Sequence, residues 1–131
     1  MSYGTLYLIP VFLGDARPEL LSPTLVRIAG SLTDFVVENE KSARAFLKAV
    51  GTTVPMQQLR FQVLNEHTPT QEVAPLLDSL LAGKDVGLMS EAGSPGIADP
   101  GSELIRLAHA KGIRIVPLSG PSSILLGLMA S

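Results

Sequence analysis

Five short apolar runs, separated by longer segments of helical character, constrain the fold of this chain most strongly. The runs are rich in Val, Ile, Leu or Phe, which is typical of strands buried on both faces. Because strands that alternate with helices pair in parallel through right-handed crossovers, the pattern predicts an α/β fold: a layered, mainly parallel five-stranded sheet with helices on both faces. The expected strands are Thr5–Pro10, Asp34–Glu38, Leu59–Leu64, Asp85–Ser90 and Ile113–Leu118.

The segments between the runs carry start and stop signals for helices. Thr68-Pro69-Thr70-Gln71 combines a threonine N-cap, a proline at the first helical position and a glutamine at the third. Asp99-Pro100 repeats the cap and the proline, and Gly83 and Gly112 are natural left-handed C-caps. Helices are therefore expected over Pro18–Leu32, Lys41–Val50, Thr68 to Gly83, Asp99 to Gly112, and from Gly120-Pro121-Ser122 to Ser131.

Composition limits the class of protein. A chain of 131 residues matches one globular domain that buries about two-thirds of its surface. The hydrophobic share of 46% excludes disorder, and the absence of cysteine excludes a disulfide scaffold or a thiolate metal site. No apolar run approaches the roughly 18 residues of a membrane span, and the N-terminus lacks the basic region of a signal peptide, so we expect a cytoplasmic protein.

Charge is low and evenly mixed. The formal net charge is −2, and no run of Lys or Arg residues gives electrostatic support for nucleic-acid binding. The charged share of 17% is below the usual value of about 25%. A partner surface or a second domain is therefore expected to cover part of the molecule.

Two loops rich in Gly and Pro follow the fourth and fifth expected strands. Glu91–Gly101 is longer than the usual two to six residues of such connections, and Ser119–Ser123 is the second. Glycine lets a ligand approach the main chain, and each loop leads into a helix N-terminus with free N–H groups. Because ligands of parallel sheets bind outside the carboxyl ends of the strands, we expect a binding site there.

Known nucleotide loops do not fit. No Gly-Lys-Ser/Thr closes a phosphate loop, and Val11–Asp15 holds one glycine where a dinucleotide fingerprint needs three. The remaining polar residues at strand ends are Asp15, Glu38–Lys41 and Asn65–His67. His67 makes either local hydrogen bonds or acid/base contacts. His109 is interpreted as structural or exposed, and the two histidines form no ligand cluster, so no metal site is expected.

The segment Val86-Gly87-Leu88-Met89-Ser90-Glu91-Ala92-Gly93-Ser94-Pro95-Gly96-Ile97-Ala98-Asp99-Pro100-Gly101 closely resembles the strand and loop of the tetrapyrrole (corrin/porphyrin) methylase superfamily. It is most similar to the branch of ribosomal RNA small subunit methyltransferase I, which typically reads S-D-A-G-T-P-G-I-S-D-P-G. Gly4-Thr5-Leu6-Tyr7, Glu66-His67 and Val116–Ser123 also match in order. The resemblance covers essentially the whole chain.

The resemblance implies a methyltransferase with S-adenosylmethionine as cofactor, bound between two α/β domains, usually in a homodimer. This chain would be the N-terminal domain, residues 1–131, without the C-terminal one, and a surface near Ser119–Ser131 would be apolar. The positions that would contact the cofactor are Pro10, Gly93, Ser94, Pro95, Gly96, Ile97, Asp99, Pro121, Ser122 and Ser123.

Methyl transfer from a sulfonium is a direct displacement, so the protein aligns the groups and removes a proton from a hydroxyl acceptor. Glu66, Glu91 or Asp99 is expected near the line that joins the acceptor, the methyl carbon and the leaving sulfur. Glu66 or His67 is expected to be the base that takes the proton.

The branch usually reads Ala-Thr-Pro-Ile-Gly-Asn where this chain has Ile9–Asp15, and Ala-Glu-Asp-Thr-Arg where it has Val37–Lys41. Both loops border the acceptor side, so these departures bear on the identity of the acceptor, while the cofactor prediction stands. A ribose 2′-hydroxyl of ribosomal RNA is the expected acceptor, and a tetrapyrrole carbon is the alternative. A non-catalytic ligand-sensing domain and a flavodoxin-like nucleotide binder remain alternatives from other classes.

Overall fold

The computed structural model describes residues 2–12, 21–92 and 100–118. The strands are β1 (Leu6–Phe12), β2 (Asp34–Val37), β3 (Arg60–Val63), β4 (Val86–Ala92) and β5 (Ile115–Pro117). The helical elements are α1 (Pro23–Ala29), α2 (Glu40–Val50), α3 (Asp78–Leu81) and α4 (Pro100–Ala110), with the 3₁₀ turns η2 (Met56–Gln58), η3 (Thr70–Glu72) and η4 (Ala74–Leu77).

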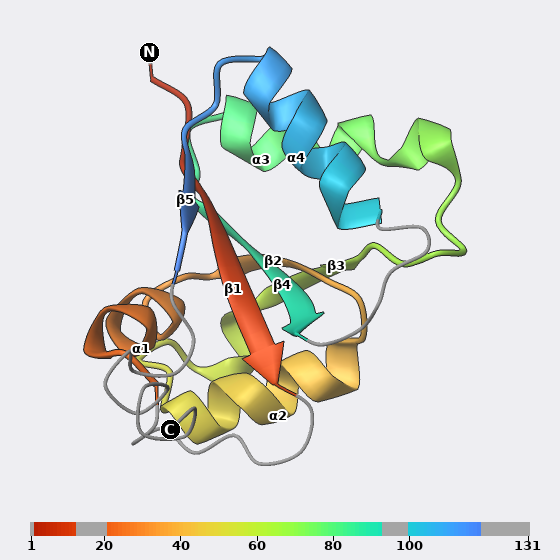
Figure 1. The fold of residues 1–131 in the computed structure, drawn as a ribbon. Coiled ribbons are helices and arrows are strands. Elements are labelled where there is room, and N and C mark those ends of the chain that lie inside the picture. The colour runs from red at the N-terminus through yellow and green to blue at the C-terminus, as the bar shows by residue number, and fades with distance from the viewer. Residues whose placement is uncertain (1, 13–20, 93–99, 119–131) are drawn as a thin grey trace, which may run out of the picture.

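The five strands form one sheet in the order β3-β2-β4-β1-β5, and every described strand pair is parallel. Helices α1 and α2 lie on one side of the sheet, and α3 and α4 lie on the other (Figure 1). The chain first moves outward from β1 to β3 and then returns to β4 and β5. The prediction of a layered, parallel five-stranded α/β sheet is confirmed.

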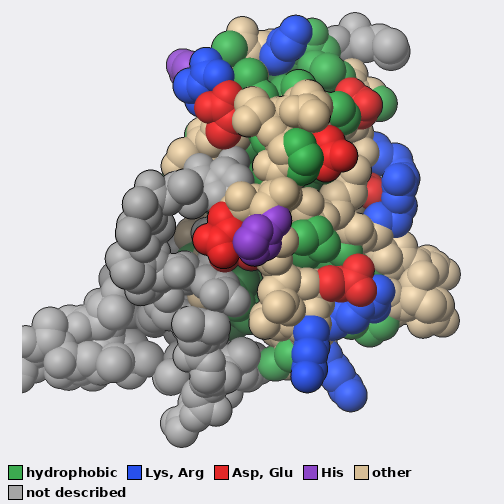
Figure 2. All heavy atoms as spheres, turned by 90° about the vertical axis from the view of Figure 1, so that its right-hand side faces the viewer, with side chains coloured by type: hydrophobic (Ala, Val, Ile, Leu, Met, Phe, Trp, Pro, Cys, Tyr) green, Lys and Arg blue, Asp and Glu red, His purple; other side chains and the backbone are tan. Residues whose placement is uncertain are grey.

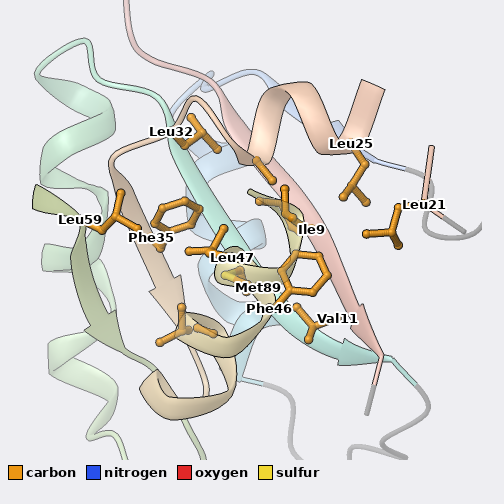
Figure 3. Packing of buried hydrophobic residues seen from close by; sticks show 14 residues of the cluster. Ile9, Val11, Leu21, Leu25, Leu32, Phe35, Phe46, Leu47, Leu59 and Met89 are labelled. Carbon is orange, nitrogen blue, oxygen red and sulfur yellow. The ribbon is translucent and has the colours of Figure 1, made fainter. Parts of the chain in front are cut away.

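A hydrophobic core fills each face of the sheet. Strand β2 is buried at all four positions, so its alternate side chains enter both cores. Side chains of α1 and α2 meet the facing strands in the first core (Figure 3), whose larger members are Ile9, Leu25, Leu32, Phe35, Phe46, Leu47 and Met89. The second core lies under η4, α3 and α4 and includes Leu6, Val36, Leu64, Leu77, Leu80, Leu88 and Leu104.

The expectation that every strand is buried on both faces is wrong for the two edge strands. Three of the four residues of β3 are exposed, and Val63 is 45% exposed. In β5, Ile115 and Val116 are half-buried and Pro117 is exposed. Each of these strands has a neighbour on one side only, and the crossover helices cover the centre of the sheet more completely than its margins.

The continuous helix expected from Thr68 to Gly83 is also wrong. The structure has two 3₁₀ turns, η3 and η4, followed by the single α-helical turn α3. Pro75 has no N–H to donate four residues back, and its ring would clash with the carbonyl of Gln71 in an α-helix. The Thr68 hydroxyl accepts from the Asn65 N–H at 3.0 Å instead of capping a helix. The stripe expected to be apolar is nevertheless buried: Val73, Leu76, Leu77 and Leu80.

Other boundaries differ by shorter stretches. Strand β4 extends to Ala92 and α4 begins at Pro100, so the connection between them is residues 93–99. Helix α1 begins at Pro23, where the Ser22 hydroxyl accepts the Leu25 N–H at 3.1 Å. Helix α2 ends as expected at Gly51, whose φ of 84° is left-handed. Among the described residues no helix is long and apolar enough to cross a membrane.

Asp34 is a buried carboxylate at the amino edge of the sheet, with 6% exposure. Its oxygens lie 3.7 Å from Arg60 Nε and 3.7 Å from Lys84 Nζ, and the Thr33 hydroxyl donates to it at 3.2 Å. These partners precede or begin three neighbouring strands. The cluster therefore holds the amino ends of β2, β3 and β4 together, at the edge opposite to the expected site.

We expect Gly87→Ala to lower the free energy of unfolding by about 1–3 kcal/mol, because overpacking forces side chains or backbone to move. A Cβ at Gly87 would lie 2.8 Å from Ile9 Cδ1, with the Cδ1 atoms of Phe35 and Leu32 at 3.0 and 3.1 Å. Ile9→Val removes the nearest of these atoms. In the Gly87→Ala background it should therefore cost less than the roughly 0.5–1.5 kcal/mol that it costs alone.

Urea unfolding of both single variants and the double variant measures the coupling between the two positions. Strictly additive losses would show that the β4 backbone, and not the Ile9 side chain, absorbs the added methyl group.

Candidate functional site

The carboxyl edge of the sheet has the topology of a binding crevice. Strand β2 leads to α2 on one face, whereas its neighbour β4 leads to α4 on the other (Figure 1). Loops that leave adjacent strands in opposite directions open a space between them, and ligands of open α/β sheets bind at such points. The two loops rich in Gly and Pro leave the ends of β4 and β5 at this same edge.

A shallow pocket, open to solvent, lies at this edge. Met89 of β4, one of its lining residues, pairs in register with Ile9 of β1 and Val37 of β2. The lining combines four apolar residues with three polar ones: Val11, Val37, Ala43 and Met89, and Glu38, Asn39 and Ser42. The space it encloses is about 10 Å³, roughly what one water molecule needs, whereas sites that enclose a small molecule measure about 300–1,000 Å³. The described residues therefore enclose only part of such a ligand.

The polar residues that line the pocket lie at the N-terminus of α2. Asn39 has an extended backbone and its side-chain oxygen accepts the Ser42 N–H at 3.0 Å, while its carbonyl accepts the Ala43 N–H at 3.1 Å. An asparagine N-cap thus fixes where the helix begins and where Ser42 lies. Glu38, half-buried, comes directly before this cap.

Pro10 is the one predicted cofactor residue that the described part of the chain includes. The N–H of Leu6 and the carbonyl of Leu8 bond to the β5 side, to Arg114 and Leu118. Pro10, two residues further, faces the same side, but the β1–β5 pairing ends at Leu8↔Pro117. The absence of an N–H at Pro10 therefore removes no hydrogen bond to β4. The Pro10 carbonyl points past the end of the β1–β5 pairing.

The other predicted cofactor residues lie outside the described residues. They are Gly93, Ser94, Pro95, Gly96, Ile97, Asp99, Pro121, Ser122 and Ser123. The same holds for Asp99 as a catalytic candidate and for the surface expected near Ser119–Ser131. The described residues that flank these segments are Ala92 at the end of β4, Pro100 at the start of α4, and Leu118, which follows β5.

Glu66 and His67 lie in a turn after the edge strand β3. The Asn65 side chain accepts the His67 N–H at 2.8 Å, and Thr68 closes the turn. The Glu66 carboxylate is 3.5 Å from His67 Nε2, and the two side chains are 74% and 84% exposed. Neither residue lines the pocket. Glu66 and His67 therefore lie beside each other but outside the pocket.

Glu38 is among the polar strand-end residues expected from the sequence, but it was not predicted to be a base. Its position directly after a fully buried strand was the available signal, since β2 adjoins the central strand and β3 does not. That signal depends on strand order, which the chain order β1 to β5 does not reveal. His109 is exposed, in agreement with its interpretation. The described residues include no group of three His, Cys, Asp or Glu side chains able to hold a metal ion.

Folding also groups cations that the sequence separates. In α2 the buried residues are Ala43, Phe46, Leu47 and Val50. Lys41, Arg44 and Lys48 lie three and four positions apart on the outward side, which we call the α2 basic face. Lys41 and Lys48 are exposed. The expectation of no basic cluster therefore holds for runs in the sequence but not for the folded surface.

Comparison with protein families and curated sequences gives a consistent result. The sequence profile described as Tetrapyrrole (Corrin/Porphyrin) Methylases matches residues 5–131. Ribosomal RNA small subunit methyltransferase I of Pseudomonas aeruginosa is 30% identical over 131 residues, and that of Xylella fastidiosa is 33% identical over 128 residues. These alignments cover 100% and 98% of this chain but 44% of each relative. The chain thus spans less than half the length of these relatives.

Solved structures agree on the fold. A cobalt precorrin-4 methyltransferase superposes with a TM-score of 0.65 at 17% identity, covering 96% of this chain and 49% of the other. A uroporphyrin-III-C-methyltransferase from Thermus thermophilus gives 0.58 at 19% identity, covering 92% and 49%. Identities this low support a shared architecture only.

The cap at the pocket gives a testable difference between two substitutions. Asn39→Ala should lower the free energy of unfolding by about 1 kcal/mol, because the Ser42 N–H loses its acceptor. Asn39→Asp should preserve stability, since a carboxylate oxygen accepts the same N–H and favours the helix N-terminus. Urea unfolding of the two variants measures this, and equal losses would mean that the cap does not hold the helix start.

Proposed function

Because the chain belongs to the tetrapyrrole (corrin/porphyrin) methylase family, we propose that it is the N-terminal α/β domain of a methyltransferase. Its cofactor would be S-adenosylmethionine and its acceptor a ribose 2′-hydroxyl of ribosomal RNA. A C-terminal domain would close the cleft, and the enzyme would act as a homodimer. The observation that carries the proposal is the pocket at the switch point between β2 and β4, at the edge that the two loops rich in Gly and Pro also join.

The groups at this edge suit the proposed cofactor. A methionine carboxylate and ammonium are matched by peptide N–H and C=O groups, and an adenine edge by the same groups. A sulfonium is matched by carbonyl or carboxylate oxygens, such as the Pro10 carbonyl. S-adenosylmethionine, when bound, supplies an activated methyl group. The residues expected to hold it remain Pro10, Gly93–Ile97, Asp99 and Pro121–Ser123.

The protein's own task is then to orient the acceptor and take its proton. Glu38 lines the pocket beside Asn39 and Ser42, whose polar side chains can orient a ribose. Glu38 therefore joins Glu66, His67 and Asp99 as a candidate base. The apolar wall of Val11, Val37 and Met89 would exclude water from the reacting hydroxyl.

Ribosomal RNA is favoured over a tetrapyrrole by the pattern of similarity. The relatives that are 30% and 33% identical carry the ribosomal RNA name. The solved structures named for tetrapyrrole substrates are 17–19% identical. Tetrapyrrole methylation remains the second candidate, because the family includes it.

Calorimetry tests the cofactor. The complete protein should bind S-adenosylmethionine and its demethylated product, and should not bind flavin mononucleotide or ATP. Methyl transfer to in vitro transcribed small-subunit ribosomal RNA, or to small ribosomal subunits, then separates an enzyme from a sensor. Binding of ATP or flavin mononucleotide in place of the methyl donor would overturn the cofactor proposal.

Separate substitutions identify the base. Glu38→Gln, Glu66→Gln and Asp99→Asn remove one carboxylate each, with Glu72→Gln, an exposed residue of η3, as the matched control. Loss of a general base lowers kcat by about 10²- to 10⁴-fold. We expect this loss for Glu38→Gln, with unchanged calorimetric affinity for S-adenosylmethionine. A loss confined to Glu66→Gln would instead assign the base to the turn after β3, and three unaffected rates would exclude all three carboxylates.

A further inference from the structure

The α2 basic face is an exposed surface of one charge sign in a chain of net charge −2. Lys41, Arg44 and Lys48 share the outward side of the helix, opposite its four buried residues. Figure 2 shows Lys and Arg side chains at the lower end of that view, the end at which α2 lies in Figure 1. The helix itself contains one carboxylate, that of Glu40.

That carboxylate is engaged with Arg44. Arg44 Nε donates to Glu40 Oε2 at 3.4 Å, one helical turn away. Lys41 and Lys48 form no ion pair with any residue that the structure describes. The surface therefore carries positive charge that the described protein leaves uncompensated.

Helix stability accounts for only part of this arrangement, since the helix dipole favours Lys48 in the last turn. Like charges three or four residues apart, as in Lys41–Arg44 and Arg44–Lys48, repel each other. Lys41 also lies in the first turn, where the helix dipole disfavours a cation. An anionic partner would offset both effects.

An aromatic support holds the central cation. The Arg44 guanidinium carbon lies 4.7 Å from the centroid of the Phe61 ring, within the range of a cation–π contact. Phe61 in turn stacks on Phe35 of the core, with centroids 5.6 Å apart. The Arg44 side chain is still 42% exposed, so a positioned guanidinium remains accessible.

The basic face is continuous with the pocket. Lys41 lies between Asn39 and Ser42, which both line it. Lys48 lies seven positions after Lys41 along the helix, or about 10 Å away. A stacked nucleic-acid strand carries one phosphate per about 3.4 Å of axis, so the face can follow about three phosphates leading away from the pocket.

Resting on the proposed function, we propose that the α2 basic face binds the sugar-phosphate backbone of the acceptor RNA and directs the target ribose to the pocket. Such contacts set position without reading sequence. The carboxyl edge selects the reacting group, and the helix holds the strand that carries it.

The test uses the complete protein and in vitro transcribed small-subunit ribosomal RNA. Lys41→Gln/Lys48→Gln removes two phosphate contacts, so the slope of log K against log salt should decrease by about 2. RNA affinity should fall at least tenfold, with a higher KM for RNA. The kcat at saturating RNA and the affinity for S-adenosylmethionine should not change. Glu40→Gln, which removes the neighbouring carboxylate, should strengthen RNA binding.

The matched control is Lys111→Gln/Arg114→Gln, two exposed cations near the amino end of β5, at the edge opposite to the pocket. It should leave the salt slope and the RNA affinity unchanged. A Lys41→Gln/Lys48→Gln variant with wild-type slope and KM would overturn the inference while leaving the proposed function intact. A change in its oligomeric mass by light scattering would assign the face to a second copy of the chain, which also overturns the inference.

Wild-type protein that binds RNA but transfers no methyl group would refute the proposed function. In that case a weakened variant would still support the RNA surface. Wild-type protein that binds no RNA would refute both.

Discussion

Parallel pairing around β4 is the constraint on which the rest of this structure depends. Strand β4 pairs with β2 on one side and β1 on the other, so its side chains must be covered on both faces. Two separate cores meet that demand, one under α1 and α2 and one under η4, α3 and α4. Gly87 lets Ile9, Phe35 and Leu32 approach the strand from one of these cores.

The same constraint decides where chemistry can occur. All strands point the same way, so every connection that leaves a carboxyl end emerges at one edge. Because β2 and β4 send their helices to opposite faces, their carboxyl ends form the kind of switch point at which ligands of open α/β sheets bind. The amino edge has the opposite character: the Asp34 carboxylate, with Arg60 and Lys84, holds three strands together there.

Much of the fold was readable from local patterns, and the errors have physical causes. Gly51, Gly83 and Gly112 mark helix ends because the left-handed backbone of a C-cap is a property of a few adjacent residues. The segment after β3 was misread because its apolar stripe is helical in period although Pro75 forbids a continuous α-helix. The edge strands were misread because an apolar run has the same composition whether one neighbour or two flank it.

For the candidate site, the sequence by itself determined the loops rich in Gly and Pro and the family resemblance, because these reside in contiguous motifs. It also supplied Glu66 and His67 as an adjacent pair. Only the tertiary structure decided that Glu38 and Ser42 line one pocket with Val11 and Met89, and that the α2 basic face begins beside that pocket. Strand order and helix orientation set such proximities, and both result from burying two cores at once, which no local stretch of sequence encodes.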